Sequence, residues 1–254
     1  ARAAKMGFLT RMLGWNLMAA PWARRTCNTS PSSHGGPSGS AADQPRADEH
    51  AMSGITGFIA LDGAPADVAR ISAMLETLRH RGPDRQQAWI GGHAAFGHAL
   101  LATTPEALAE AQPWVHPQTG CVVVCDSRLD NRPHLLKALA IEADPDTIGD
   151  GALLHAAWQR WGRDCADRLR GDFAFAIWDP RRQRLFCARD PMGVRPLYLH
   201  HAPGKRIVFA SSADAVLAHG GIERSLDEGR IADALVGETE GIDATCTFFK
   251  NVQR

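Results

Sequence analysis

The sequence predicts an α+β fold in which layered sheets are covered by helices. Three observations support this prediction: short apolar, β-branched runs recur along the chain, stretches with helical spacing of apolar residues lie between them, and turn residues separate the two. Because each strand or helix must bury its apolar face against another element, many strands with interleaved helices favour stacked layers.

The regular pattern begins at Ser53. A buried strand is expected over residues 55–61, and an amphipathic helix is expected to begin near Pro65. The apolar residues of that helix recur at three- and four-residue spacing: Val68, Ile71, Leu75 and Leu78. Two strands follow near 87–90 and 94–100. The β-branched run at 121–125 is typical of a central strand.

Helical spacing returns in the second half of the chain, at 132–140 and 151–162. Residues 173–177 alternate phenylalanine or isoleucine with alanine, which indicates a strand with one bulky and one small face. A turn at 179–182 leads into a partner strand at 184–189. The remaining elements are expected to be strands near 196–200 and 206–211 and helices near 212–219 and 227–236.

Composition narrows the classes of function. The 254 residues carry 28 basic and 28 acidic side chains, so a strongly basic nucleic-acid-binding surface is not expected. The longest apolar runs fall short of the roughly 18 residues of a membrane span. Six cysteines without metal-like spacing indicate reduced thiols in a cytoplasmic protein. His98 and the pair His200-His201 have no ligand-like companions, so no metal site is expected.

Residues 1–52 differ in kind from the rest. Residues 28–50 are rich in Ser, Gly, Pro, Asp and Ala with almost no large apolar side chain, which predicts disorder. A competing interpretation makes this stretch translated sequence upstream of a true start at Met52. Because the chain begins at Ala1 and ends at Arg254 without a capping signal, it is expected to be a fragment at both ends.

Several motifs in a fixed order resemble one family. They are Met52-Ser53-Gly54-Ile55-Thr56-Gly57-Phe58, Arg79-His80-Arg81-Gly82-Pro83-Asp84, the run 171–179 and the run 189–198. Together they resemble the N-terminal glutaminase domain of asparagine synthetases, a class II glutamine amidotransferase of the N-terminal-nucleophile hydrolases. The resemblance implies a four-layer αββα sandwich over residues 53–254. It also implies a C-terminal synthetase domain beyond Arg254, which would use ATP and Mg, and no cofactor in this chain.

The resemblance places the catalytic nucleophile at Ser53, where the family has cysteine. Such hydrolases use their own α-amino group, with a pKa of about 8, as the general base, so Ser53 would need a free amine. The family asparagine that donates to the oxyanion corresponds to Asp126, which can only accept when ionised. The backbone N–H of Ser127 could still donate, although the family has glycine there.

Substrate recognition is half retained. Arg81 matches the arginine that holds the α-carboxylate of glutamine, and Asp150 matches an aspartate that holds its α-ammonium. Arg128 stands where the family has a glutamate that also pairs with the ammonium. A like charge at this position is expected to weaken the binding of glutamine.

Structural interpretations stand beside these roles. Ser53 could be only the first residue of a strand, Arg81 an ion-paired turn residue, and Asp150 a helix N-cap. Asp126, Arg128 and Asp130 could form an ion-pair network. Cys125, next to the altered run, is interpreted as a buried strand cysteine and not as a relocated nucleophile.

Two functions follow from the resemblance. One is a degenerate glutaminase domain that serves as scaffold for an amide-forming ligase, as in the lasso-peptide and β-lactam synthetase branch. The alternative is an active domain that hydrolyses glutamine and supplies ammonia for asparagine synthesis. The expected partners are glutamine, if the site is active, and the chain's own synthetase domain. A homodimer is an open option, whereas nucleic acid and membrane are not expected.

Overall fold

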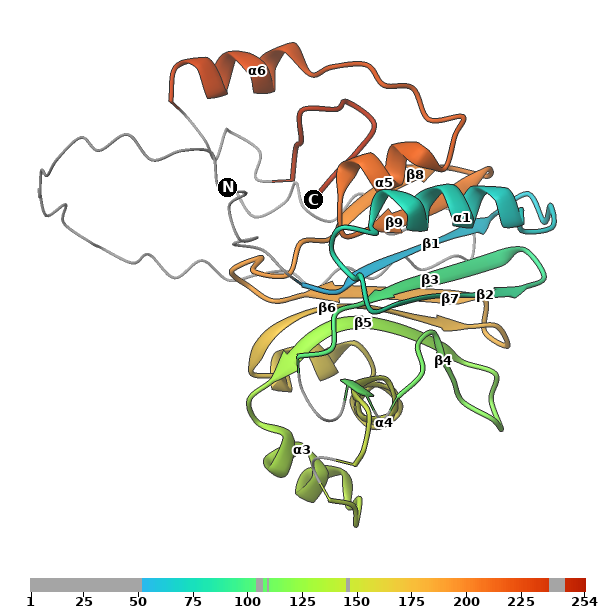
Figure 1. Cartoon of the computed structure of the whole chain (residues 1–254), viewed down its shortest axis with the longest axis vertical. Coiled ribbons are helices and arrows are strands. Elements are labelled where there is room, and N and C mark those ends of the chain that lie inside the picture. Colours follow the sequence, from blue (N-terminus) through green and yellow to red (C-terminus); the bar gives the residue numbers. More distant parts are fainter. Residues whose placement is uncertain (1–51, 104–106, 109, 145–146, 238–244) are drawn as a thin grey trace, which may run out of the picture.

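Two antiparallel sheets form the centre of this computed structural model (Figure 1), which describes residues 52–103, 107–108, 110–144, 147–237 and 245–254. The five-stranded sheet has the order β2-β3-β1-β9-β8, and the four-stranded sheet has the order β4-β5-β6-β7. In the first sheet, β1 pairs with β3 on one side and β9 on the other, so it is a central strand. The disorder predicted for residues 1–52 falls almost wholly outside the described residues.

The elements have the following bounds. The strands of the five-stranded sheet are β1 (Gly54–Ala60), β2 (Arg85–Gly91), β3 (Ala94–Leu100), β8 (Tyr198–Ala202) and β9 (Arg206–Ala210). Those of the four-stranded sheet are β4 (Trp114–Val115), β5 (Val122–Leu129), β6 (Gly171–Asp179) and β7 (Arg184–Arg189). The helices are α1 (Val68–Thr77), α3 (Arg132–Leu139), α4 (Asp150–Trp161), the 3-10 helix η1 (Gly162–Arg168), α5 (Ala213–Ala218) and α6 (Glu228–Leu235).

Three apolar clusters separate four layers. One cluster joins α1 and α5 to the outer face of the five-stranded sheet, and includes Ile71, Met74 and Val216. A second joins α3, α4 and η1 to the outer face of the four-stranded sheet. The third lies between the two sheets. Figure 1 shows the resulting order of helix, sheet, sheet and helix, and the predicted α+β sandwich is therefore confirmed.

The alternation predicted in β6 determines which layer each side chain enters. Phe173 and Phe175 lie in the cluster that faces α4, whereas Ala174 and Ala176 lie between the sheets. The small alanines share that space with large rings from the opposite sheet, including Phe96 and Phe209. This complementarity of small and large residues lets the two sheets pack face to face at interior density.

Most predicted elements are present, with a few differences. Val68 was expected on the buried face of its helix, but its side chain is 61% exposed; it is the first helical residue of α1. The helix starts after Asp67, whose carboxylate accepts a hydrogen bond from the Ala69 N–H at 2.8 Å, and not at Pro65. The strand predicted at 121–125 continues to Leu129. Among the described residues no helix is long and apolar enough to cross a membrane.

Gly82 illustrates how closely the loop before β2 approaches β3. A Cβ atom built on Gly82 would lie 2.1 Å from the Ala99 carbonyl carbon, inside the backbone of β3. We expect Gly82→Ala to lower the free energy of unfolding by roughly 1–3 kcal/mol, because the backbone must shift to relieve the overlap. Urea unfolding followed by circular dichroism measures this effect.

Gly229→Ala is the control within helix α6, since its Cβ would lie 3.3 Å from Oδ1 of the N-cap Asp227 and would meet no backbone atom. There alanine should be neutral or stabilise by about 0.5–1 kcal/mol. Equal effects at Gly82 and Gly229 would contradict the close approach.

Candidate functional site

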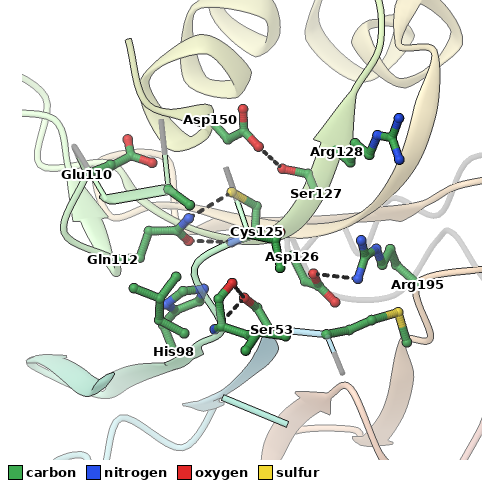
Figure 2. Close-up of a pocket in the computed structure, with 15 residues that line it drawn as sticks. Ser53, His98, Glu110, Gln112, Cys125, Asp126, Ser127, Arg128, Asp150 and Arg195 are labelled. Atoms are coloured by element: carbon green, nitrogen blue, oxygen red, sulfur yellow. Dashed lines mark hydrogen bonds and ion pairs between the residues drawn. The ribbon is translucent and has the colours of Figure 1, made fainter. Parts of the chain in front are cut away.

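A pocket of about 170 Å³ opens where the two sheets end together, beside the start of β1 and the second half of β5. Four of the predicted site residues line it: Ser53, Asp126, Ser127 and Asp150. Figure 2 shows Ser53 below and Asp150 above, with β5 passing between them. Side chains far apart in the sequence therefore converge on one space.

Ser53 is fixed by the backbone that follows β3. Its hydroxyl oxygen accepts a hydrogen bond from the Leu101 N–H at 3.0 Å and donates to the Leu101 carbonyl at 3.3 Å. The pairing of β1 with β3 sets this geometry, because Gly54 lies opposite Ala99 and the two chains continue side by side. The position predicted for the nucleophile thus lines the pocket, with its hydroxyl engaged by the main chain.

The edge of β5 faces the pocket because β4 is only two residues long. β4 pairs with Val122 and Val123 and leaves the rest of β5 uncovered on that side. The Gln112 side chain replaces the missing strand, since its amide oxygen accepts from the Cys125 N–H at 2.7 Å. In an antiparallel ladder alternate residues point their N–H groups to the same edge, so the Ser127 N–H faces the pocket side as well.

Asp126 is buried in an ion pair. Its side chain is 5% exposed, and its Oδ1 lies 3.2 Å from an Nη atom of Arg195. The loop that carries Arg195 is held by Asp190, which accepts hydrogen bonds from the Val194 and Arg195 N–H groups at 3.0 and 2.9 Å. Burial raises the pKa of Asp126 to about 7, although the positive charges of Arg195 and Arg81 oppose the rise. Near neutral pH both its ionised and its neutral form are therefore populated.

Arg81 lies behind the pocket and not on its wall. Its aliphatic stem approaches Gly54, and desolvation lowers the pKa of its guanidinium. Its buried Nε and Nη2 atoms have no hydrogen-bond partner among the described residues. The interpretation of Arg81 as an ion-paired turn residue is therefore not supported, because Asp126, the acid whose charge acts on Arg81, pairs with Arg195.

Asp150 is held by neighbours on two sides. Its Oδ2 accepts a hydrogen bond from the Ser127 hydroxyl at 2.5 Å, and its Oδ1 pairs with the Arg132 guanidinium. The alternative interpretation of Asp150 as a helix N-cap is wrong, because Gly149 is the N-cap of α4 and Asp150 is the first helical residue. Both carboxylate oxygens are thus engaged inside the protein.

Three further pocket residues were not predicted as functional. Glu110 caps α4 from outside the helix, since its oxygens accept from the Gly151 and Ala152 N–H groups at 2.8 and 3.0 Å. Burial raises the pKa of Glu110 to about 7, against the effect of these hydrogen bonds. Gln112 and Arg195 are the others. Arg195 lies in the run 189–198 that supports the family resemblance, and a search of that run for polar side chains could have found it. No pattern in the sequence indicated a role for Glu110.

The remaining candidates have modest roles. Arg128 lines the pocket rim with its side chain 71% exposed and lies 3.5 Å from Asp130. The predicted ion-pair network of Asp126, Arg128 and Asp130 therefore does not form as a whole, because Asp126 pairs with Arg195. Cys125 is buried, and burial raises the pKa of its thiol well above the usual value. Burial lowers the pKa of His98 to about 4. Within the described part of the chain, no group of three or more His, Cys, Asp or Glu side chains could hold a metal.

Comparison with known proteins gives the site a context. The profile of a family described as a glutamine amidotransferase domain matches residues 52–254. The glutamine-hydrolysing asparagine synthetase 3 of Bacillus subtilis is 32% identical over 186 residues, 72% of this chain and 30% of that protein. Amidase chry2 of Gibberella zeae is 29% identical over 215 residues, 80% of this chain and 31% of that protein. The chain thus spans about a third of the length of these relatives.

A solved structure shares the fold. The glutamine phosphoribosylpyrophosphate amidotransferase of Bacillus subtilis superposes with a TM-score of 0.51 at 20% identity, covering 69% of this chain and 46% of that protein.

The proton on Asp126 gives the site a measurable pH dependence. Because the folded pKa of about 7 exceeds the usual value near 4, the stability linked to Asp126 is fully present below about pH 4 and is lost as the pH rises through 7. Asp126→Asn keeps the shape and cannot ionise. We expect its free energy of unfolding, relative to the original chain, to rise between about pH 4 and 7 and level off above.

Urea unfolding of both chains at several pH values measures the difference, which corresponds to about 1.4 kcal/mol for each unit of pKa shift. A difference that moves in the opposite direction would mean that the ion pair with Arg195, and not burial, sets the pKa of Asp126.

Proposed function

The chain belongs to the family of glutamine amidotransferase domains, and from this premise we propose that its own site does not hydrolyse glutamine. In this proposal the domain, residues 53–254, is a scaffold within an asparagine synthetase-like ligase that forms amide bonds. The parent protein would use ATP and Mg in a separate synthetase domain. Such a division of labour would resemble that of the lasso-peptide and β-lactam synthetases.

One observation supports this proposal above the others: the Asp126–Arg195 ion pair in the wall of the Ser53 pocket. Hydrolysis of an amide needs donors aimed at the oxyanion of the tetrahedral intermediate, and losing one costs roughly 10²–10³ in rate. The ionised Asp126 carboxylate offers no donor and repels a developing negative charge. Arg195 already satisfies one of its oxygens, which favours that ionised form.

The nucleophile adds to this argument. A serine hydroxyl is far less ionised than a thiol near neutral pH and relies more on its general base. The Ser53 hydroxyl is also bound to both the N–H and the carbonyl of Leu101. An attack on a substrate would have to break the bond to the carbonyl first.

The site for the ammonium of glutamine is altered as well. Ser127 and Arg132 occupy the carboxylate of Asp150, and Arg128 adds a positive charge at the rim. A glutamine zwitterion entering this pocket would meet Asp126 and Asp150 already paired with arginines, and Glu110 already bound to the N–H groups at the start of α4. Three independent features of one pocket therefore oppose turnover.

The alternative function is hydrolysis of glutamine to supply ammonia for asparagine synthesis. Two observations favour it: the predicted residues do converge on one pocket, and the raised pKa of Asp126 leaves part of the population with a proton to donate. In that case Ser53 with a free α-amine would be the nucleophile, and Arg81 and Asp150 would hold the substrate. A cytoplasmic location is part of both proposals.

The first test uses a chain that begins at Ser53, with mass spectrometry to verify its free amine. We expect this chain to release ammonia and glutamate from glutamine no faster than a Ser53→Ala chain, because the site lacks a donor for the oxyanion. Turnover above the Ser53→Ala level, in protein of native circular dichroism, would support the alternative.

A second test rebuilds the site in steps. Ser53→Cys alone should remain near background, whereas Ser53→Cys combined with Asp126→Asn, Ser127→Gly and Arg128→Glu should be roughly 10²–10³ faster, because the oxyanion donor returns. Ammonia release at saturating glutamine is the readout. Full activity from Ser53→Cys alone would refute the argument from Asp126 and Arg128.

A further inference from the structure

The acids of the pocket are each compensated by a neighbour. Asp150 is bonded to Ser127 and Arg132, and the side chains of Asp150 and Arg132 are only 13% and 9% exposed. Asp126 pairs with Arg195 at 3.2 Å. A ligand with an ammonium group would therefore compete with the protein's own cations for every one of these carboxylates.

Glu110, the third acid, is directed at a helix and not at a ligand. Its two oxygens accept hydrogen bonds from the Gly151 and Ala152 N–H groups at the start of α4. Withdrawing it to bind an ammonium would leave those N–H groups without their acceptor, and buried donors without acceptors are costly. Each of the three acids therefore already has a partner inside the protein, with which the ammonium group of a ligand would have to compete.

Asp126 offers an unpartnered oxygen in the wall of the pocket. The charges of Arg81 and Arg195 act on this carboxylate against those of Asp150 and Asp172, and the Nε atoms of both arginines have no partner among the described residues. Asp126 Oδ2 also lacks a partner, although the residue is only 4% exposed and lines the pocket. This oxygen can accept an N–H from a carboxamide.

Arg128 adds a positive charge at the rim of the pocket, with Asp172 opposite it on β6. Side chains two residues apart on a strand point to the same face, so Arg128 follows Asp126 on the face that continues the inter-sheet residues Val122 and Val124. Its acid neighbour Asp130 is 60% exposed and 3.5 Å away, a surface ion pair of the kind that contributes little. A carboxylate arriving from solvent can therefore use the charge of Arg128.

We propose that this pocket binds a small carboxylate that carries a carboxamide and no ammonium group, in preference to a free amino acid. Arg128 would hold the carboxylate at the rim, and Asp126 would accept the carboxamide N–H at the wall. The volume of about 170 Å³ is below the roughly 300–1,000 Å³ of pockets for drug-sized ligands, which suits a molecule the size of an amino acid. The inference rests on the proposal that the site does not turn glutamine over.

The test compares two probes that differ only in the α-amino group: L-glutamine and glutaramate, its des-amino form. Isothermal titration calorimetry on the full chain gives both dissociation constants. Glutaramate should bind at least about tenfold tighter, because an ammonium without a partner loses a charged hydrogen bond on leaving water.

Variants of Arg128 test which charge sets the preference. Arg128→Gln should weaken glutaramate about tenfold and change glutamine much less, since for glutamine the lost attraction of the carboxylate is offset by relief of the repulsion between Arg128 and the ammonium. Arg128→Glu should reverse the preference, although it places a like charge opposite Asp172 on β6. Arg163→Glu is the matched control: Arg163 is 75% exposed, has an acidic neighbour at 3.7 Å and does not line the pocket, so both affinities should be unchanged.

Equal or tighter binding of glutamine would overturn the inference, as would the absence of binding by either probe or an unaltered preference in both Arg128 variants. Ammonia released during the titrations is measured separately and tests only the proposed lack of turnover. If the protein binds glutaramate more tightly but also hydrolyses glutamine, only the proposed function is refuted. If it binds glutamine more tightly and does not hydrolyse it, only the inference about the ligand is refuted.

Discussion

The apolar contact between the two sheets is the constraint on which the rest of the molecule depends. Side chains from both sheets, among them Ile55, Phe96, Val124 and Trp178, fill one continuous layer. Burying such side chains stabilises by roughly 1.5–3 kcal/mol each, so this contact fixes how one sheet lies on the other. Because Ser53 precedes β1 and Asp126 lies near the end of β5, the same contact brings them to one pocket. The site is thus largely a consequence of sheet packing, to which the start of α4 adds Asp150 and the loops add Glu110, Gln112 and Arg195.

The sequence could predict the elements because periodicity is a local property. The alternation in β6 and the three- and four-residue spacing in α1 both appear within about ten residues, and the structure contains both elements. Errors occurred where local rules compete at a boundary. Pro65 suggested a helix start that Asp67 provides, and a two-residue strand such as β4 has too few residues to show a period.

The site was predicted less completely, for a different physical reason. Family motifs indicated Ser53, Asp126, Ser127 and Asp150, which share the pocket, and Arg81, which lies behind its wall. They could not indicate the partners. Glu110 reaches Gly151 from 41 residues away, and no pattern along the chain records such a pairing. The charge state of Asp126 likewise depends on burial and on Arg195, both of which exist only after folding.

The shortness of β4 has a consequence for how the protein avoids self-association. An uncovered strand edge presents N–H and carbonyl groups that another chain can pair with, which makes edges a route to aggregation. Gln112 blocks part of that edge on β5 with a single amide group, which occupies the N–H of Cys125 as a neighbouring strand would. Gln112 thereby shortens the stretch of the β5 edge on which another chain could pair, while the pocket beside that edge stays open.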